Sequence, residues 1–172
     1  MIAAGDMTHS DYLSDQFERE RLHDAAQSGN IEEVKRLLNE GYQPTEFDDL
    51  GKTPLHYAAA GRHLETMKLL IDSGASVNAH DERVIGDTPL GEVAGSCSYE
   101  VAKLLIDSGA DPTIPGWMQL TALHKARDRK RPEGLRVRQL LERPGTVIAL
   151  RIRSFQQLQV WDGVEGLRSD HS

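Results

Sequence analysis

The sequence predicts an all-α protein, a solenoid of about four helix-turn-helix repeats. Three observations predict this fold class. Four similar segments recur at a spacing close to 33 residues. Each segment carries apolar residues at helical period on two short stretches, which indicates two helices per unit. The apolar fraction of 38% is low for a compact globule but suits a stack with a thin, continuous core.

The segments align on leucines, on glycines and on one short motif. The leucines are Leu22, Leu55, Leu90 and Leu123, spaced 33, 35 and 33 residues apart. The glycines that follow in step are Gly41, Gly74 and Gly109. The motif reads TPLH at 53–56, TPLG at 88–91 and TALH at 121–124. Its threonine is a helix N-cap residue and its proline suits the first helical position, while a glycine ends the second helix in the left-handed conformation.

This pattern resembles the ankyrin repeat, whose hallmark is the sequence TPLH, and the chain is similar to short freestanding bacterial ankyrin-repeat proteins. The resemblance implies that each unit is a helix, a turn, a second helix and an extended β-turn finger. We expect a repeat domain over 15–143, preceded by a flexible arm over 1–14. The expected repeats cover 15–46, 47–79, 80–112 and 113–143. For the tail over 144–172 we favour poor order; the alternating Ile148, Leu150 and Ile152 leave a strand or a segment packed on the last repeat as alternatives.

Two local departures from the repeat are visible. The finger of the third segment is two residues longer than the others, and so is the turn between the helices of the fourth. Arg62 and Cys97 stand in the inter-helix turn where many repeats have glycine, so a left-handed backbone there costs up to about 1 kcal/mol. We predict an unreactive Cys97, because its sequence neighbours include no cation.

Charge and composition exclude several classes of function. The net charge is −7, but residues 1–124 carry 9 Lys/Arg and 21 Asp/Glu (−12), whereas residues 125–172 carry 11 and 6 (+5). The acidic body argues against nucleic-acid binding, and no apolar run approaches the roughly 20 residues of a membrane helix. The N-terminus has no pattern of a secretion signal, so we expect the protein in the cytoplasm. We also expect a monomer. The basic C-terminal part faces an acidic partner, contacts the acidic body or is simply solvated.

The resemblance implies a binding surface formed by the finger tips and the concave face of the inner helices. The candidates on the fingers are Phe47, Asp49, Lys52, Glu82, Arg83, Val84, Ile85, Trp117 and Met118. Those on the inner helices are Tyr57, Glu92 and Lys125. Trp117 and the pair Val84 and Ile85 are either anchors for a partner or a cover over neighbouring apolar surface. His56 and His124 belong to the repeat motif, and for them we predict a structural role bridging adjacent fingers.

The sequence contains no phosphate loop, no nucleophile motif and no cluster of metal ligands, so we predict neither an enzyme nor a cofactor or metal site. We therefore predict a module that binds a protein partner. The alternative is an immunity or inhibitor protein that neutralises a basic toxin or enzyme. This alternative follows from the −12 of residues 1–124, because an acidic concave face would attract a basic partner electrostatically.

Overall fold

The computed structural model describes residues 20–81, 83 and 86–143. The arm predicted over 1–14 and the tail predicted over 144–172 lie outside these residues. The chain is helical over residues 20–28. The following helices are α2 (Ile31–Asn39), α3 (Pro54–Ala60), α4 (Leu64–Asp72), α5 (Pro89–Val93), α6 (Tyr99–Asp107), the short 3₁₀ turn η1 (Trp117–Gln119), α7 (Ala122–Arg127) and α8 (Pro132–Leu141).

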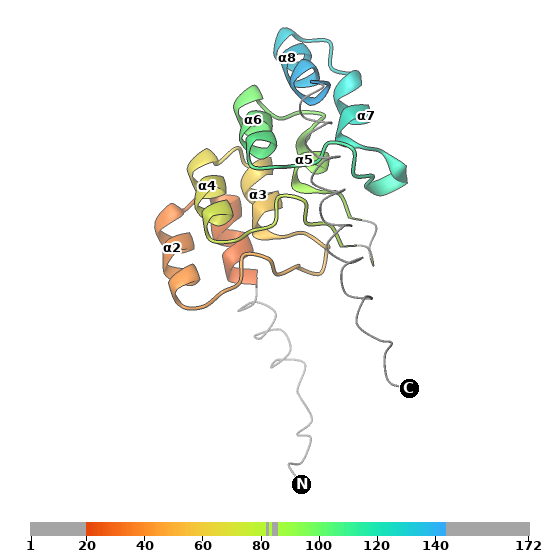
Figure 1. Cartoon of the computed structure of the whole chain (residues 1–172). Helices are drawn as coiled ribbons and strands as arrows, with labels where there is room; N and C mark the ends of the chain where they lie inside the picture. Colours follow the sequence, from red (N-terminus) through yellow and green to blue (C-terminus); the bar gives the residue numbers. More distant parts are fainter. Residues whose placement is uncertain (1–19, 82, 84–85, 144–172) are drawn as a thin grey trace, which may run out of the picture.

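The helices form two parallel rows. Helices α2, α4, α6 and α8 pack in succession as the outer row, and α3, α5 and α7 form the inner row beside them (Figure 1). The extended fingers project from the start of the inner helices toward one side of the stack (Figure 1). The described residues contain no strand. The predicted all-α solenoid is therefore confirmed.

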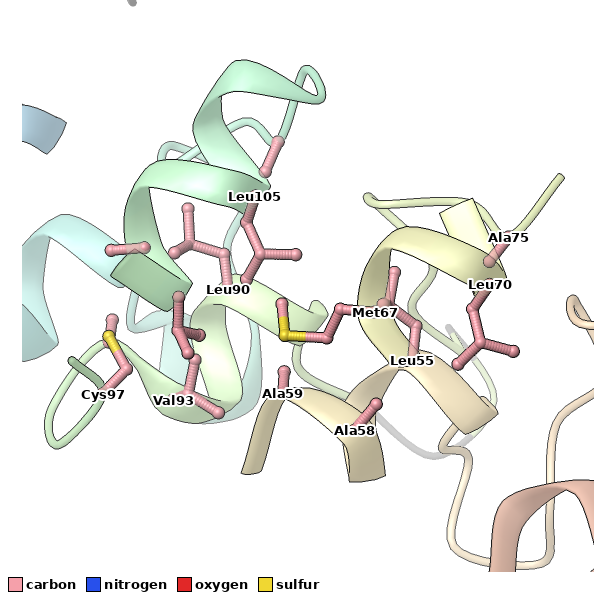
Figure 2. Close-up of a cluster of buried hydrophobic side chains, with 14 of the residues drawn as sticks. Leu55, Ala58, Ala59, Met67, Leu70, Ala75, Leu90, Val93, Cys97 and Leu105 are labelled. Atoms are coloured by element: carbon pink, nitrogen blue, oxygen red, sulfur yellow. The ribbon is translucent and has the colours of Figure 1, made fainter. Parts of the chain in front are cut away.

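One apolar core runs along the stack between the two rows. The repeat leucines Leu55 and Leu90 are fully buried, and so are Met67 and Leu105 of the outer helices. In Figure 2, Met67 lies between the side chains of its own repeat and Leu90 of the next. Burying each such side chain contributes about 1.5–3 kcal/mol. Because part of that burial is against a neighbouring unit, stability depends on stacking.

The predicted helix boundaries have the expected backbone chemistry. Gly41, Gly74 and Gly109 follow the outer helices with φ of 100°, 96° and 95°, in the left-handed region. The hydroxyl of Thr88 accepts a hydrogen bond from the Gly91 N–H at 3.0 Å and so caps α5. The outer helices of the first three repeats thus end at local signals in the sequence, and α5 begins at one.

The turn between α7 and α8 differs from the expectation of two extra residues. The turn 128–131 has one residue more than the turn 61–63 between α3 and α4. The turn is longer only because α7 has six residues where α3 has seven. Both extra residues belong to the start of α8, which begins five residues before the buried Val137, whereas α4 begins three residues before the buried Met67. Pro132 is the physical reason, because its fixed φ suits the first helical position and starts the helix early.

Candidate protein-binding surface

The finger of the second repeat ends in a tight turn that exposes a leucine. The Asp48 N–H donates to the Lys52 carbonyl at 2.9 Å, and the Gly51 N–H donates to the Asp48 carbonyl at 3.0 Å. The Asp48 carboxylate also accepts from the backbone N–H groups of Leu50 and Lys52, at 3.0 and 2.8 Å. The side chain of Leu50 stands at the tip and is 67% exposed. The finger is thus a rigid support for an exposed apolar group.

The finger of the fourth repeat is closed by the equivalent pair of hydrogen bonds. The Gly116 N–H donates to the Leu120 carbonyl at 3.0 Å, and the Gln119 N–H donates to the Gly116 carbonyl at 3.1 Å. Met118 occupies the place of Leu50 and is 66% exposed. Met118 and Gln119 both have positive φ, at 54° and 59°. Two apolar side chains therefore stand at equivalent tips, two repeats apart.

The finger of the third repeat is extended by two residues, as the sequence spacing predicts. The Gly86 N–H donates to the Asp81 carbonyl at 3.0 Å, which closes the turn across the insertion. Asp81 accepts a bidentate ion pair from Arg83, at 2.8 and 3.0 Å. This pair lowers the pKa of Asp81. The predicted site residues Glu82, Val84 and Ile85 lie outside the described residues.

Two ion pairs join neighbouring repeats along the concave side, and we call them the ladder. The Lys52 ammonium contacts the Glu92 carboxylate at 2.8 Å. One repeat further on, the Lys125 ammonium contacts the Asp87 carboxylate at 2.6 Å. The two pairs join equivalent positions of the repeat. Lys52 and Asp87 each stand directly before a motif threonine, and their partners, Glu92 and Lys125, each stand two residues after the repeat leucine of the next unit. In the first pair the cation belongs to the earlier repeat, and in the second pair the anion does. In both pairs the two charges neutralise each other.

Tyr57 belongs to the same face. Its hydroxyl donates to the Asp48 carboxylate at 2.6 Å, and the Lys52 ammonium lies 5.8 Å from the ring centroid. Burial and the bond to Asp48 raise the pKa of Tyr57. Tyr57 thus braces its own finger, and its side chain is half-buried.

The motif histidines bridge adjacent fingers. Nδ1 of His56 accepts the Thr53 N–H at 2.9 Å, so Nε2 carries the proton and donates to the Asp87 carbonyl at 2.9 Å. Nε2 of His23 lies 3.1 Å from the Glu46 carbonyl in the corresponding position. His124 makes the local contact to Thr121, whose N–H lies 3.2 Å from Nδ1. The predicted bridge is present at His56.

The remaining predicted site residues lie on the fingers. Phe47 is half-buried and Asp49 is exposed. Trp117 begins η1, and its side chain lies outside what the structure describes. Sequence reasoning missed Leu50, although a leucine between an aspartate pair and a glycine, at a turn tip, is the signal that identifies it.

Cys97 has a cation beside it in space, although its sequence neighbours include none. Nη1 of Arg129 lies 3.9 Å from the Cys97 sulfur, and Nη2 donates to the Cys97 carbonyl at 2.8 Å. The two residues are 32 positions apart in the chain, in adjacent repeats, which is why sequence proximity gives no signal. Burial nevertheless dominates and raises the pKa of Cys97. Cys97 lacks a positive φ, whereas Arg62 has φ of 61°.

Much of the acidic charge lies away from the concave side. Six carboxylates stand on the outer helices: Glu32, Glu33, Glu65, Asp72, Glu100 and Asp107. Several have ion-pair partners on their own helix, such as Lys68 with Glu65 at 2.8 Å. The −12 of residues 1–124 is therefore spread over the outside of the stack as well.

The described residues offer neither a membrane-spanning helix nor a metal site. Their helices include none that is long and apolar enough to cross a membrane. They also include no group of three or more His, Cys, Asp or Glu side chains arranged to hold a metal ion.

Comparison with known families identifies the class. The family model described as ankyrin repeats (3 copies) matches residues 22–116, which is 95 of the 172 residues. The chain belongs to the ankyrin-repeat family. Repeats of this family form a non-enzymatic fold that generally mediates interactions between proteins.

The relatives carry these repeats in different settings. The chain is 38% identical over 66 residues to the E3 ubiquitin-protein ligase XBAT32 of Arabidopsis thaliana, over 37% of this chain and 13% of the relative. It is 42% identical over 67 residues to human diacylglycerol kinase iota, over 36% of this chain and 6% of the relative. Human ankyrin repeat domain-containing protein 39 is 36% identical over 63 residues, 37% of this chain and 34% of the relative. The chain thus spans at most about a third of these relatives.

Proposed function

We propose that this chain binds a protein partner through its finger tips and the concave side of its inner helices. The observation that carries the proposal is the pair of exposed apolar side chains, Leu50 at 67% and Met118 at 66%, on fingers whose turns are closed by equivalent hydrogen bonds. A side chain on a rigid support loses little further entropy on binding. Exposed apolar groups at a turn tip contribute nothing to the core, whereas a partner that covers both side chains gains the free energy of burying them.

The test is a binding assay that compares matched apolar replacements. The full chain serves as bait for affinity capture with quantitative mass spectrometry, followed by calorimetry with the partner so identified. Leu50→Ser with Met118→Ser should weaken binding at least about tenfold, because each anchor contributes about 1–2 kcal/mol. Leu135→Ser is the control, since Leu135 is exposed at 44% on α8, away from the fingers. Equal binding by both variants would refute the site.

Capture of a basic toxin or enzyme stays a prediction from net charge. It requires carboxylates that are free to meet cations, whereas Glu92 and Asp87 on the concave side each have a lysine partner. The salt dependence of the affinity distinguishes this alternative from apolar binding at the finger tips. An interaction with a basic partner weakens steeply with ionic strength. Binding carried by Leu50 and Met118 is nearly insensitive to salt.

A further inference from the structure

A basic groove lies where the turns between paired helices meet, at the end of the inner helices away from the finger tips. Its volume is about 680 Å³. The cations that line it are Arg62, Lys125, Arg129, Lys130 and Arg131. Asp128 and Glu133 also line it. Because Lys125 is neutralised by its ion pair with Asp87, the other four cations face two negative charges, a balance of +2. We call this site the turn groove.

Three of the five cations are held in place by the array itself. The Arg62 guanidinium donates to the Ser96 carbonyl of the next repeat at 3.0 Å. Arg129 donates to the Cys97 carbonyl at 2.8 Å, and Lys125 belongs to the ladder. The bonds of Arg62 and Arg129 go to neutral carbonyls of the neighbouring turn, so these two walls of the groove are preorganised and keep their positive charge, whereas Lys125 is neutralised by Asp87.

The other two cations have no protein partner among the described residues. Lys130 and Arg131 are exposed on the turn before α8, and no hydrogen bond or ion pair with a described residue uses their side chains. Arg131 is the N-cap residue of α8, and its side chain does not cap the helix. The positive end of the α8 dipole therefore adds to the field of the groove.

We propose that the turn groove binds an acidic segment of a protein partner, with its carboxylates on Lys130 and Arg131. Guanidinium groups bind carboxylates in a bidentate geometry. The volume suits a few side chains of an extended peptide. A long polyanion such as nucleic acid also meets the acidic body, −12 over residues 1–124, and is repelled. A short segment stays within about a Debye length, ~10 Å, of the groove.

This site does not rest on the proposed function, because the residues that hold the carboxylates, Lys130 and Arg131, belong to neither the fingers nor the concave side of the inner helices. The experiment measures fluorescence anisotropy of a short labelled peptide rich in glutamate against the full chain, beside the same peptide with glutamine. The glutamate peptide should bind and the glutamine peptide should not. Lys130→Gln with Arg131→Gln should weaken binding about tenfold, as expected for two partly exposed charge contacts. Lys130→Arg with Arg131→Lys keeps the charge and should retain binding.

The matched control removes the same charge from the same repeat outside the groove. Arg127 and Arg143 are exposed and do not line it, so Arg127→Gln with Arg143→Gln should bind the glutamate peptide like the wild type. Equal losses in both double variants would reveal a nonspecific charge effect and overturn the proposal. A single-stranded oligonucleotide that binds as tightly as the peptide, and competes with it, would overturn it as well. Circular dichroism of each variant verifies that the fold is retained.

Discussion

The buried imidazole of His56 links the stability of the array to pH. Its two nitrogens are occupied by the Thr53 N–H and the Asp87 carbonyl, which fixes the neutral ring with the proton on Nε2. Burial lowers the pKa of His56 below its ordinary value. A proton on Nδ1 would lose the Thr53 bond and place a charge in the core between two fingers.

From this we expect stability to fall in mild acid. Below the ordinary histidine pKa of about 6.5, the unfolded chain binds a proton that the native chain does not, so protonation favours unfolding. The free energy of unfolding in urea should therefore drop between about pH 7 and about pH 5. His56→Asn is less stable throughout but should lose less over this interval. Identical losses in the two proteins would show that His56 is not the titrating group.

At the scale of an element, the finger of the fourth repeat holds an unfavourable backbone. Gln119 has φ of 59° in the position where Gly51 of the second finger has φ of 70°. A side chain in the left-handed region costs roughly 1 kcal/mol, and the equivalent hydrogen bonds of the two turns indicate that both need this conformation.

Exchanging the residues at these equivalent positions should shift stability in opposite directions. Gln119→Gly should raise the free energy of unfolding by about 0.5–1 kcal/mol, because glycine adopts positive φ without steric cost. Gly51→Gln should lower it by a similar amount. Chemical unfolding monitored by circular dichroism measures both. A loss of stability in Gln119→Gly would mean that the glutamine side chain contributes contacts that outweigh its backbone cost.

At the scale of the whole molecule, stability is distributed along a line. Among the described residues, the helices of each repeat pack mainly against those of the neighbouring repeats, as the succession α2–α4–α6–α8 indicates. The fourth repeat therefore has one stacking partner within the described residues, and the third has two. Removing a buried side chain of similar size should therefore unfold more of the array when it is done in the third repeat than when it is done in the fourth.

Hydrogen exchange with mass spectrometry resolves this difference. Leu105→Ala, at a fully buried position of α6, should cost about 2–5 kcal/mol and raise exchange across the array. Val137→Ala, equally buried in α8, should raise exchange mainly in α7 and α8 and leave α3 and α4 protected. If Val137→Ala deprotects all helices equally, the array unfolds as a single cooperative unit.

The sequence predicts the helices well because their boundaries are local. Thr88, Pro89 and Gly109 act within a few residues of themselves, and the repeat leucines mark the inner row wherever they recur. Side-chain contacts between repeats are harder to predict from the sequence. Arg129 and Cys97 are 32 residues apart, and no sequence pattern indicates that these two side chains meet.

The same contrast applies to the binding surface: the positions of the fingers are predictable from the sequence, whereas the pairing of side chains between repeats is not. The register of the fingers comes from the motif, so the sequence alone predicts Met118 as a residue near a finger tip. Lys52 and Lys125, candidates by position, have ion-pair partners in the structure. Their pairing depends on side chains contributed by an adjacent unit. A turn groove assembled from three consecutive turns is likewise invisible along the chain.

The inverted signs of the ladder give the repeats a fixed order. Lys52 meets Glu92, and Asp87 meets Lys125. If the unit carrying both Asp87 and Glu92 were lost, Lys52 would face Lys125, and two ammonium groups would repel each other across the junction. Duplicating that unit would instead set Asp87 against a second Glu92. Gene rearrangements that shorten or lengthen this array by one unit are therefore penalised at the junction, and the number of repeats is encoded in charge as well as in shape.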